Sequence, residues 1–385
     1  MNICILTPRF PFPENGGDVL RINSVARYLK NKGHKLILCS FYDNEVEDSD
    51  YKTANQLYDV IYKVKRNKWL SLFNVMRYMI MQKPMQCGFY ASGKYNNVFK
   101  QVIKNETPDL YISHLIRMTP YLEKNGLYSN SIIEMTDALS KTYGLSSNSN
   151  GFSLKKIIYK FEKNLIKKYE QKVINNFKKV VLVSKADIEY LGNQESLSFY
   201  TNGINCIEKA KSYNSNKICF VGNMRTLQNQ DAALTFINKI LPAVKKELPD
   251  VEFHIVGAQP PENIQKLVDN KTIFVTGFVD SVEEYIKDSA VLVAPVNIAA
   301  GIQNKVLIGM ACNIPVVMTS LISKAIPELV SGDNCFIEDD VKKFADICIK
   351  LCKDNKLRNK IASAGYKVMK TNYSWDAILN DYEDL

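Results

Sequence analysis

The sequence predicts an α/β protein made of two doubly wound, Rossmann-like domains that face a central cleft. Short apolar strand patterns alternate with helical patterns, glycines follow several of the strands, and the alternation restarts after about residue 216. A chain of 385 residues is long enough for two domains with separate cores. We therefore expect domains at residues 1–200 and 201–364, with a C-terminal helix at about 365–385 packing back on the first.

The first domain begins with a strand, a loop, a helix and a second strand. The helix is expected at residues 19–31, where Gly33 ends it, and residues 66–105 are expected to be helical with breaks at Pro84 and Gly88. Apolar β-rich runs predict strands at residues 2–6, 34–40, 60–64, 109–113, 131–135 and 179–184. This order predicts a mostly parallel sheet, since helices separate most of the strands.

Residues that suit ligand binding stand at the ends of these strands. Gly16 and Gly17 precede the first helix, where they let a ligand approach the backbone N–H groups. His114 ends one strand, and Asp137 follows the next. Because ligands of parallel α/β sheets lie beyond the carboxyl ends of the strands, both side chains are candidates for chemistry, although a histidine there is often structural.

The second domain repeats the pattern after a polar, loop-like segment at residues 195–216, where we expect the interdomain linker. Strands are predicted at residues 218–221, 251–256 and 272–276, each followed by a glycine turn, and a helix at about 231–248. The tail from residue 341 is expected to be helical, with Trp375 packed against one of the domains.

Residues 291–319 form the most informative stretch. An apolar strand, a turn rich in small residues, a helix that opens beside Lys305 and a strand entered through Pro315 follow one another within about thirty residues, the length of a βαβ unit. A helix N-terminus offers unpaired N–H groups to an anion, and a lysine beside it adds a full charge. The stretch is therefore a candidate anion site.

The net charge of +10 lies in the first half of the chain. Residues 1–200 hold 29 Lys and Arg against 18 Asp and Glu, a charge of +11, which leaves −1 for the rest. The clusters at residues 63–68 and 155–179 suit an anionic membrane face or a lipid-phosphate acceptor, or are the solvated sides of ordinary helices. No helix-turn-helix, RNA-binding or zinc-finger signature accompanies the charge, so nucleic acid is not an expected partner.

Compartment and metal binding follow from three further patterns. The apolar run at residues 69–81 is too short to span a bilayer, and no basic segment precedes the apolar N-terminal strand, so no signal peptide is expected. Nine cysteines without a CxxC pair and three histidines show no ligand spacing, so no metal is predicted. We expect a reducing, cytoplasmic location, peripheral to the inner face of the membrane.

Several segments, in this order and spacing, resemble the retaining GT-B glycosyltransferases of the large family-4 group. They are TPRFPFPENGGDVLRINSVARYLKNKGHKL near the N-terminus, NGIN at 202–205, FVGNM at 220–224, PDVEFHIVG at 249–257, VTGFV at 275–279 and APVNIAAGIQNKVLIGMACNIPVV at 294–317. The resemblance covers nearly the whole chain. It implies transfer of a sugar from a nucleotide-sugar donor, with retention of anomeric configuration and without a metal, to a glycan or lipid-linked acceptor in capsule, O-antigen or lipopolysaccharide synthesis.

The resemblance also implies roles for individual residues. The catalytic residues would be His114, Asp137 and Lys305, with Lys305 as the main charge on the leaving diphosphate. The donor would be held mostly by the second domain and the acceptor by the first. The donor-binding residues would be Gly16, Gly17, Gly222, Asn223, Arg225, Gly257, Phe278, Val279, Ala300, Gly301, Ile302, Asn304 and Lys305.

The chain departs from the family pattern at four positions. Ala300 and Ile308 stand where many members carry two glutamates, and Asn223 and Asn229 stand at or near positions of an Arg and a Lys. These departures leave open a second hypothesis, a catalytically impaired GT-B protein that acts as a scaffold for another transferase. A GT-B epimerase or phosphorylase is a third, without a distinctive feature in this sequence.

Overall fold

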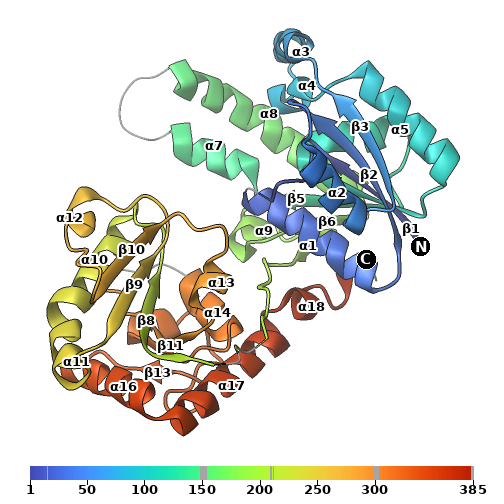
Figure 1. Cartoon of the computed structure of the whole chain (residues 1–385). Coiled ribbons are helices and arrows are strands. Elements are labelled where there is room, and N and C mark those ends of the chain that lie inside the picture. Colours follow the sequence, from blue (N-terminus) through green and yellow to red (C-terminus); the bar gives the residue numbers. More distant parts are fainter. Residues whose placement is uncertain (15, 148–153, 209, 211, 298–302, 383–385) are drawn as a thin grey trace. The chain divides into compact units, whose positions relative to one another are not determined.

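The computed structural model describes residues 1–14, 16–147, 154–208, 210, 212–297 and 303–382 (Figure 1). It divides into two compact units, Met1–Asn202 with Ile378–Leu385, and Gly203–Ala377. The C-terminal residues from Ile378 onward thus belong to unit 1, whereas the long helix before them belongs to unit 2. Each unit is described by itself below.

Unit 1 is built on a seven-stranded sheet in which every strand pair is parallel. The strand order is β3-β2-β1-β4-β5-β6-β7, so the chain moves outward in one direction from β1 and then returns to β4 on its other side. The strands are β1 Asn2–Thr7, β2 Lys35–Tyr42, β3 Val60–Lys65, β4 Leu110–His114, β5 Ser131–Thr136, β6 Lys179–Leu182 and β7 Leu197–Phe199.

Helices connect these strands and supply much of the core of unit 1. Local signals define several ends: Gly33 follows α1 with φ +83°, and the Ser92 hydroxyl accepts a hydrogen bond from the Tyr95 N–H at the start of α5. The helices are α1 Gly17–Asn31, α2 Asp48–Leu57, α3 Lys68–Ile80, α4 Met85–Phe89, α5 Gly93–Glu106, the 3₁₀ turn Ile116–Met118, α6 Thr119–Lys124, α7 Leu139–Ser147, α8 Leu154–Asn176 and α9 Lys185–Leu191.

Unit 2 repeats the architecture with a six-stranded parallel sheet in the order β10-β9-β8-β11-β12-β13. Its strands are β8 Asn214–Val221, β9 Glu252–Val256, β10 Ile273–Gly277, β11 Ser289–Ala294, β12 Val316–Met318 and β13 Phe336–Ile337. Its helices are α10 Leu227–Thr235, a π-helical turn Phe236–Ile240, α11 Leu241–Glu247, α12 Glu262–Gln265, α13 Val282–Ile286, α14 Asn304–Ala311, α15 Ser320–Ser323, α16 Val341–Lys353 and α17 Asn355–Asn372; α18 Trp375–Ile378 reaches unit 1.

The predicted α/β class with two parallel sheets is confirmed. The strands were predictable because both faces of a parallel sheet are covered by other elements. Each strand is therefore a continuous run of apolar residues, as in the fully buried β11. The polar linker predicted at residues 195–216 was wrong in part, because β7 lies within it and β8 begins at Asn214. β7 is a short, half-exposed edge strand, so its sequence lacks an apolar run.

Candidate functional site

The strand order fixes where a ligand can lie in each unit. In a doubly wound sheet the two strands at which the chain reverses direction leave a crevice beyond their carboxyl ends. These strands are β1 and β4 in unit 1, and β8 and β11 in unit 2. The candidate residues predicted from the sequence lie close to both points.

In unit 2, Lys305 lies in the first turn of α14 and is 7% exposed. Its ammonium group donates hydrogen bonds to Asn229 Oδ1 at 2.9 Å and to Gln303 Oε1 at 3.1 Å. It also lies 5.6 Å from the centre of the Phe220 ring, at the end of β8. The lysine is thereby fixed by neutral groups from three segments of unit 2.

The charge of Lys305 is not neutralised by its neighbours. Burial lowers the pKa of its ammonium group to about 8, because the charged form loses hydration and both of its hydrogen-bond acceptors are amides. At pH 7 the group is therefore still a cation. Among the described residues, no carboxylate pairs with this ammonium group, so an anionic ligand would offset the lost hydration.

Two glycines bring the turns after β8 and β9 into direct contact. A Cβ on Gly257 would lie 2.1 Å from the carbonyl oxygen of Gly222, and one on Gly222 would lie 2.7 Å from the Asn229 side chain. Gly257 also has φ +148°. Asn229 in turn donates to the Asn223 carbonyl at 2.9 Å. The glycines therefore allow the packing that holds Asn229 against Lys305.

A pocket of about 450 Å³ opens at this place. Its walls combine the turn after β8, the start of α10 and the N-terminus of α14, whose preceding residue Gln303 makes no side-chain cap. Asn304 and Ile308 contribute from α14, so an apolar side chain lies where many members of the family that the sequence resembles carry a glutamate. The lining residues are Val221, Gly222, Asn223, Gln228, Asn229, Gln303, Asn304, Lys305 and Ile308.

Four other predicted donor residues of unit 2 lie outside this lining: Gly257, which packs on Gly222, and Arg225, Phe278 and Val279. Arg225 is exposed on the turn before α10, and its backbone N–H donates to Asn223 Oδ1. Phe278, which is 75% exposed, and the half-buried Val279 follow β10, two strands away from β8. The predicted contacts of Ala300, Gly301 and Ile302 lie outside the described residues.

In unit 1, His114 ends β4 beside β1 and is 2% exposed. Among the described residues, neither ring nitrogen has a hydrogen-bond partner. Burial lowers the pKa of His114 to about 3, against the opposing charge of Asp18, so the ring is neutral at pH 7. A buried imidazole with both nitrogens unpaired costs stability, which favours a role in binding a ligand over a structural role.

Asp137 and the glycine pair occupy neighbouring positions on the same edge of the sheet. Asp137 follows β5, and partial burial of its carboxyl group, together with the charge of Asp187, raises its pKa. Gly16 has φ +122° and precedes α1, which begins at Gly17. The order β1-β4-β5 thus brings the glycine pair, His114 and Asp137 to three adjacent strand ends.

A buried ion pair beside these residues has no counterpart in the sequence-based predictions. Arg21 of α1 and Glu134 of β5 are 1% and 0% exposed and form two hydrogen bonds, of 2.6 and 3.2 Å. Arg21 also donates to the Thr201 carbonyl and to Asn202 Oδ1, both at 3.2 Å. The pair therefore ties the helix after the glycine pair to β5 and to the end of unit 1.

Gln303 and Gln228, which line the unit 2 pocket, were not predicted from the sequence either. The polar side chain directly before the predicted helix at Lys305 was the only signal for Gln303. The acid in the otherwise apolar strand SIIEM was a signal for Glu134. Neither signal identifies the partner, because Arg21 and Glu134 are 113 residues apart.

Two negative findings apply only to the part of the chain that the structure describes. No group of three or more His, Cys, Asp or Glu side chains there is arranged to hold a metal ion. No helix there has the length and apolar character needed to cross a membrane.

Comparisons with known proteins agree with this geometry. Residues 215–354 match the family model described as glycosyl transferases group 1. A relative from Klebsiella pneumoniae, an uncharacterized 44.6 kDa protein in the cps region, is 24% identical over 384 residues, covering 96% of each chain. The resemblance to glycosyltransferases predicted from the sequence is confirmed.

Solved structures show the same fold at low sequence identity. Staphylococcus aureus TarM, in complex with fondaparinux, α-GlcNAc-glycerol and UDP, has a TM-score of 0.60 and 10% identity, covering 100% of this chain and 99% of its own. Anabaena HepE in complex with UDP-glucose has a TM-score of 0.57 and 13% identity, with coverage of 100% and 99%. A Rickettsia africae glycosyltransferase has a TM-score of 0.58 and 15% identity, and the match covers 100% of this chain and 97% of that one.

Proposed function

Because residues 215–354 form a glycosyl transferase group 1 domain in a chain of GT-B fold, we propose that the protein transfers a sugar from a nucleotide-sugar donor to a glycan or lipid-linked acceptor. We propose further that the anomeric configuration is retained. The observation that carries the proposal is Lys305, a nearly buried cation that is held by two amides and lines the pocket at the β8–β11 reversal.

The donor diphosphate is proposed to bind beside Lys305 and the N-terminus of α14. As the bond to the sugar breaks, negative charge grows on the diphosphate, and a cation already fixed in place stabilises it without reorganisation. Lys305 and the N-terminus of α14 supply this charge, which supports the proposal that catalysis needs no metal. The amides of Asn223, Gln228 and Asn304 are proposed to bind phosphate and ribose oxygens.

A uridine diphosphate sugar is the proposed donor to test first. The support is that TarM and HepE were solved with UDP or UDP-glucose. Gly257, Phe278 and Val279, on the turns after β9 and β10, are proposed to face the base. Ile308 offers no hydrogen bond to a ribose hydroxyl, so the amides of the pocket would have to replace the carboxylate that many members use.

The unit 1 residues are proposed to act on the transferred sugar and on the acceptor. The neutral ring of His114 would hydrogen-bond the sugar, because both of its nitrogens are unpaired among the described residues. Asp137 would accept the proton of the acceptor hydroxyl, for which a raised pKa makes it a better base. Gly16 and Gly17 would present backbone N–H groups to a phosphate or to the acceptor.

We propose cell-surface polysaccharide synthesis, in the cytoplasm, as the setting. Support comes from the cps-region relative and from nine cysteines that are all free. The scaffold hypothesis, supported by Ile308 in the pocket, predicts no turnover with any donor. Transfer or hydrolysis measured over a panel of UDP-, GDP-, CMP- and ADP-sugars separates the two: turnover excludes the scaffold, and none with any donor overturns the proposed enzyme.

The affinity for UDP is expected to fall above pH 8. A bound diphosphate favours the charged lysine, whereas the free protein loses this proton as the pH rises through about 8. The dissociation constant should therefore be nearly constant below pH 7.5 and rise toward about tenfold per pH unit above pH 8. Calorimetric titration between pH 6.5 and 9 checks this, and in Lys305→Met the dependence should disappear.

Replacing His114 with Ala is expected to lower kcat by about ten- to a hundredfold. This is the effect of losing one hydrogen bond to a group that is charged or becomes charged in the reaction. Since the pKa of His114 is about 3, its charge state should not contribute a step to the pH profile between 5 and 8. Steady-state kinetics of the wild type and the variant test both statements. A kcat of His114→Ala equal to that of the wild type would show that the ring does not contact the reacting sugar.

A further inference from the structure

Helix α3, Lys68–Ile80, presents most of its apolar side chains to solvent and buries two polar ones. Its two buried residues are Ser71 and Asn74. Trp69 is 83% exposed and Ile80 79%, and the exposed large apolar side chains of this segment are Trp69, Leu70, Leu72, Phe73, Met76, Met79, Ile80 and Met81. They make up half of the sixteen such side chains in the part of the chain that the structure describes.

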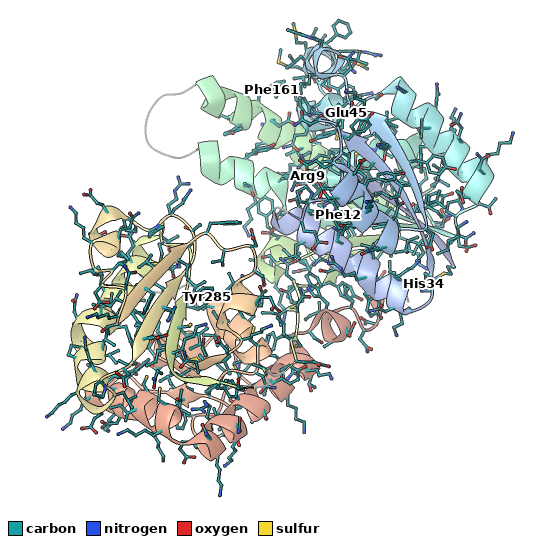
Figure 2. All side chains as sticks on the ribbon, viewed as in Figure 1. Arg9, Phe12, His34, Glu45, Phe161 and Tyr285 are labelled. Carbon is teal, nitrogen blue, oxygen red and sulfur yellow. The ribbon has the colours of Figure 1, made fainter. Side chains whose placement is uncertain are left out.

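The inward face explains why the helix cannot turn over to bury these side chains. Asn74 Nδ2 donates to the Ala91 carbonyl at 2.9 Å. A Cβ on Gly88 of α4 would lie 2.8 Å from both the Asn74 carbonyl oxygen and the Tyr78 ring, so the two helices are in close contact. Figure 2 shows many side chains of α3, the helix labelled in Figure 1, projecting away from the rest of unit 1. The apolar face is therefore held outward by specific contacts.

The charges around this face select its partner. Residues 66–105 contain seven Lys and Arg and no Asp or Glu, a net charge of +7. Lys68, Arg77 and Lys83 are exposed on α3 or directly after it. Apolar and aromatic side chains flanked by cations match the interface of an anionic bilayer, where Trp sits at the headgroup level and cations meet lipid phosphates.

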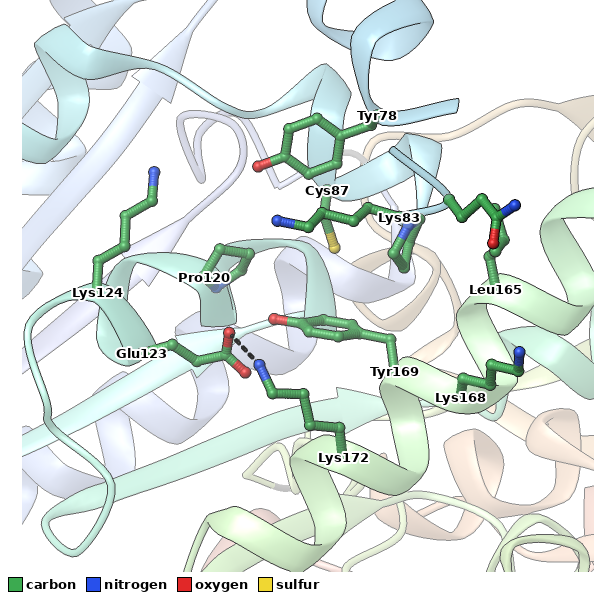
Figure 3. A pocket seen from close by; sticks show the side chains of 12 residues that line it. Tyr78, Lys83, Cys87, Pro120, Glu123, Lys124, Leu165, Lys168, Tyr169 and Lys172 are labelled. Atoms are coloured by element: carbon green, nitrogen blue, oxygen red, sulfur yellow. Dashed lines mark hydrogen bonds and ion pairs between the residues drawn. The ribbon is translucent and has the colours of Figure 1, made fainter. Parts of the chain in front are cut away.

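A second feature, a pocket of about 380 Å³, adjoins the C-terminal end of α3 (Figure 3). Tyr78, Gln82 and Lys83 form one side of it, and Lys168, Tyr169 and Lys172 of α8 form another. Lys124 also lines it, so four lysines face one acid, Glu123, which pairs with Lys172 at 3.0 Å. The pocket thus keeps an excess of positive charge.

Two residues that line this pocket each have a buried polar atom without a partner in the described part of the chain. Among the described residues, the buried Tyr169 hydroxyl and Glu123 Oε1 have no hydrogen-bond partner. The Tyr169 hydroxyl can donate to a phosphate oxygen, whereas the Glu123 carboxylate cannot, and the four lysines outweigh the negative charge of Glu123. Pro84, Pro120 and Leu165 supply apolar walls. A group with a phosphate head and an apolar body fits this combination.

We propose that α3 docks unit 1 onto an anionic membrane and that the neighbouring lysine pocket receives the phosphate of a membrane lipid. Trp69, Phe73 and Ile80 enter the headgroup region, and Lys68, Arg77 and Lys83 meet the lipid phosphates. The inference goes beyond the proposed function, because membrane binding needs no nucleotide sugar. Its test is made without a donor, so its failure is separate from failure of the transferase proposal.

The two tryptophans provide a direct readout. Trp69 is 83% exposed and Trp375 is 8% exposed, and the chain has no others. In a Trp375→Phe variant, the remaining emission should shift to shorter wavelength with phosphatidylcholine vesicles that contain phosphatidylglycerol, and not with phosphatidylcholine alone. Brominated lipid should quench it. Absence of both effects would overturn the docking of α3.

Flotation of the full chain with the same vesicles tests the apolar face. The double variant Trp69→Ser, Phe73→Ser should lower the affinity for anionic vesicles about tenfold or more, because both rings lose burial in the interface. The matched control is Leu227→Ser in unit 2, which removes an equally exposed side chain and should bind as the wild type does. Equal vesicle binding by the wild type, the double variant and the control overturns the proposal. It is also overturned if the wild type binds no vesicles and sedimentation velocity shows that it forms a dimer instead.

The pocket is tested with the double variant Lys83→Gln, Lys168→Gln. The control is Lys271→Gln, which changes an exposed lysine of unit 2. The double variant should lose most of the preference for anionic over neutral vesicles, and the control should keep it. If vesicle binding is unchanged in the double variant but inorganic phosphate raises the Tm of the wild type alone, the pocket serves free phosphate and the lipid assignment is wrong.

Discussion

The Lys305→Met variant is expected to lose about a hundred- to a thousandfold in kcat and most of its affinity for the nucleoside diphosphate. The size follows from removing one fixed group that stabilises developing charge in a water-poor site. Met keeps the length and apolar stem of the side chain, so the lost property is the charge. Transfer or donor hydrolysis, together with calorimetric titration of the diphosphate, measures the two effects.

Lys271→Met provides the control, because it removes an exposed cation of the same unit that is not among the pocket-lining residues. It should retain both kcat and affinity. The folded state of Lys305→Met should be intact, since the substitution removes a poorly solvated charge. A variant that melts like the wild type but keeps its kcat would exclude Lys305 from the proposed role.

Breaking the Arg21–Glu134 pair is expected to destabilise unit 1 by about 3–5 kcal/mol. Both groups are nearly inaccessible, so Arg21→Met leaves a buried carboxylate and Glu134→Gln leaves a buried guanidinium without its counter-charge. Arg21→Met also removes the hydrogen bonds to Thr201 and Asn202. Urea unfolding followed by circular dichroism measures the loss in the free energy of unfolding.

The exposed pair Lys266–Glu262 serves as the matched comparison, since its side chains are 71% and 81% exposed. Lys266→Met should change the stability by less than about 1 kcal/mol. The double variant Arg21→Met, Glu134→Leu should recover part of the loss, because no unpaired charge remains. A loss of under about 1 kcal/mol in Arg21→Met would contradict the buried assignment.

The fold could be predicted from the sequence because parallel strands are apolar throughout. Runs such as residues 2–6 and 291–294 therefore marked the sheet, and glycines after β8 and β9 marked the turns at its carboxyl edge. β7 was missed because an edge strand of three half-exposed residues carries no such pattern. The helix predicted at 231–248 proved to be three consecutive segments with a π-helical turn at Phe236–Ile240.

Several residues of the candidate site could be predicted from the sequence, but the contacts between them could not. Lys305 and Asn304 could be predicted because they follow a strand and open a helix. The bond from Lys305 to Asn229 joins residues 76 apart, so only the folded sheet brings them together. Asn229 stands near a position where many family members carry a lysine, and it proves to be one of the two residues that hold Lys305 in place. The outward face of α3 was not predictable either, because amphipathic spacing does not reveal which side faces the protein.

The central claim, that the pocket beside Lys305 binds the donor diphosphate, is tested most directly by a thermal-shift measurement. The wild type and Lys305→Met are each melted with UDP, GDP, CMP and ADP. A ligand at about a hundred times its dissociation constant stabilises the folded state by about 2.7 kcal/mol. We predict that UDP raises the Tm of the wild type and leaves that of Lys305→Met nearly unchanged. Equal stabilisation of both proteins by UDP, or no stabilisation of the wild type by any of the four, would contradict the claim.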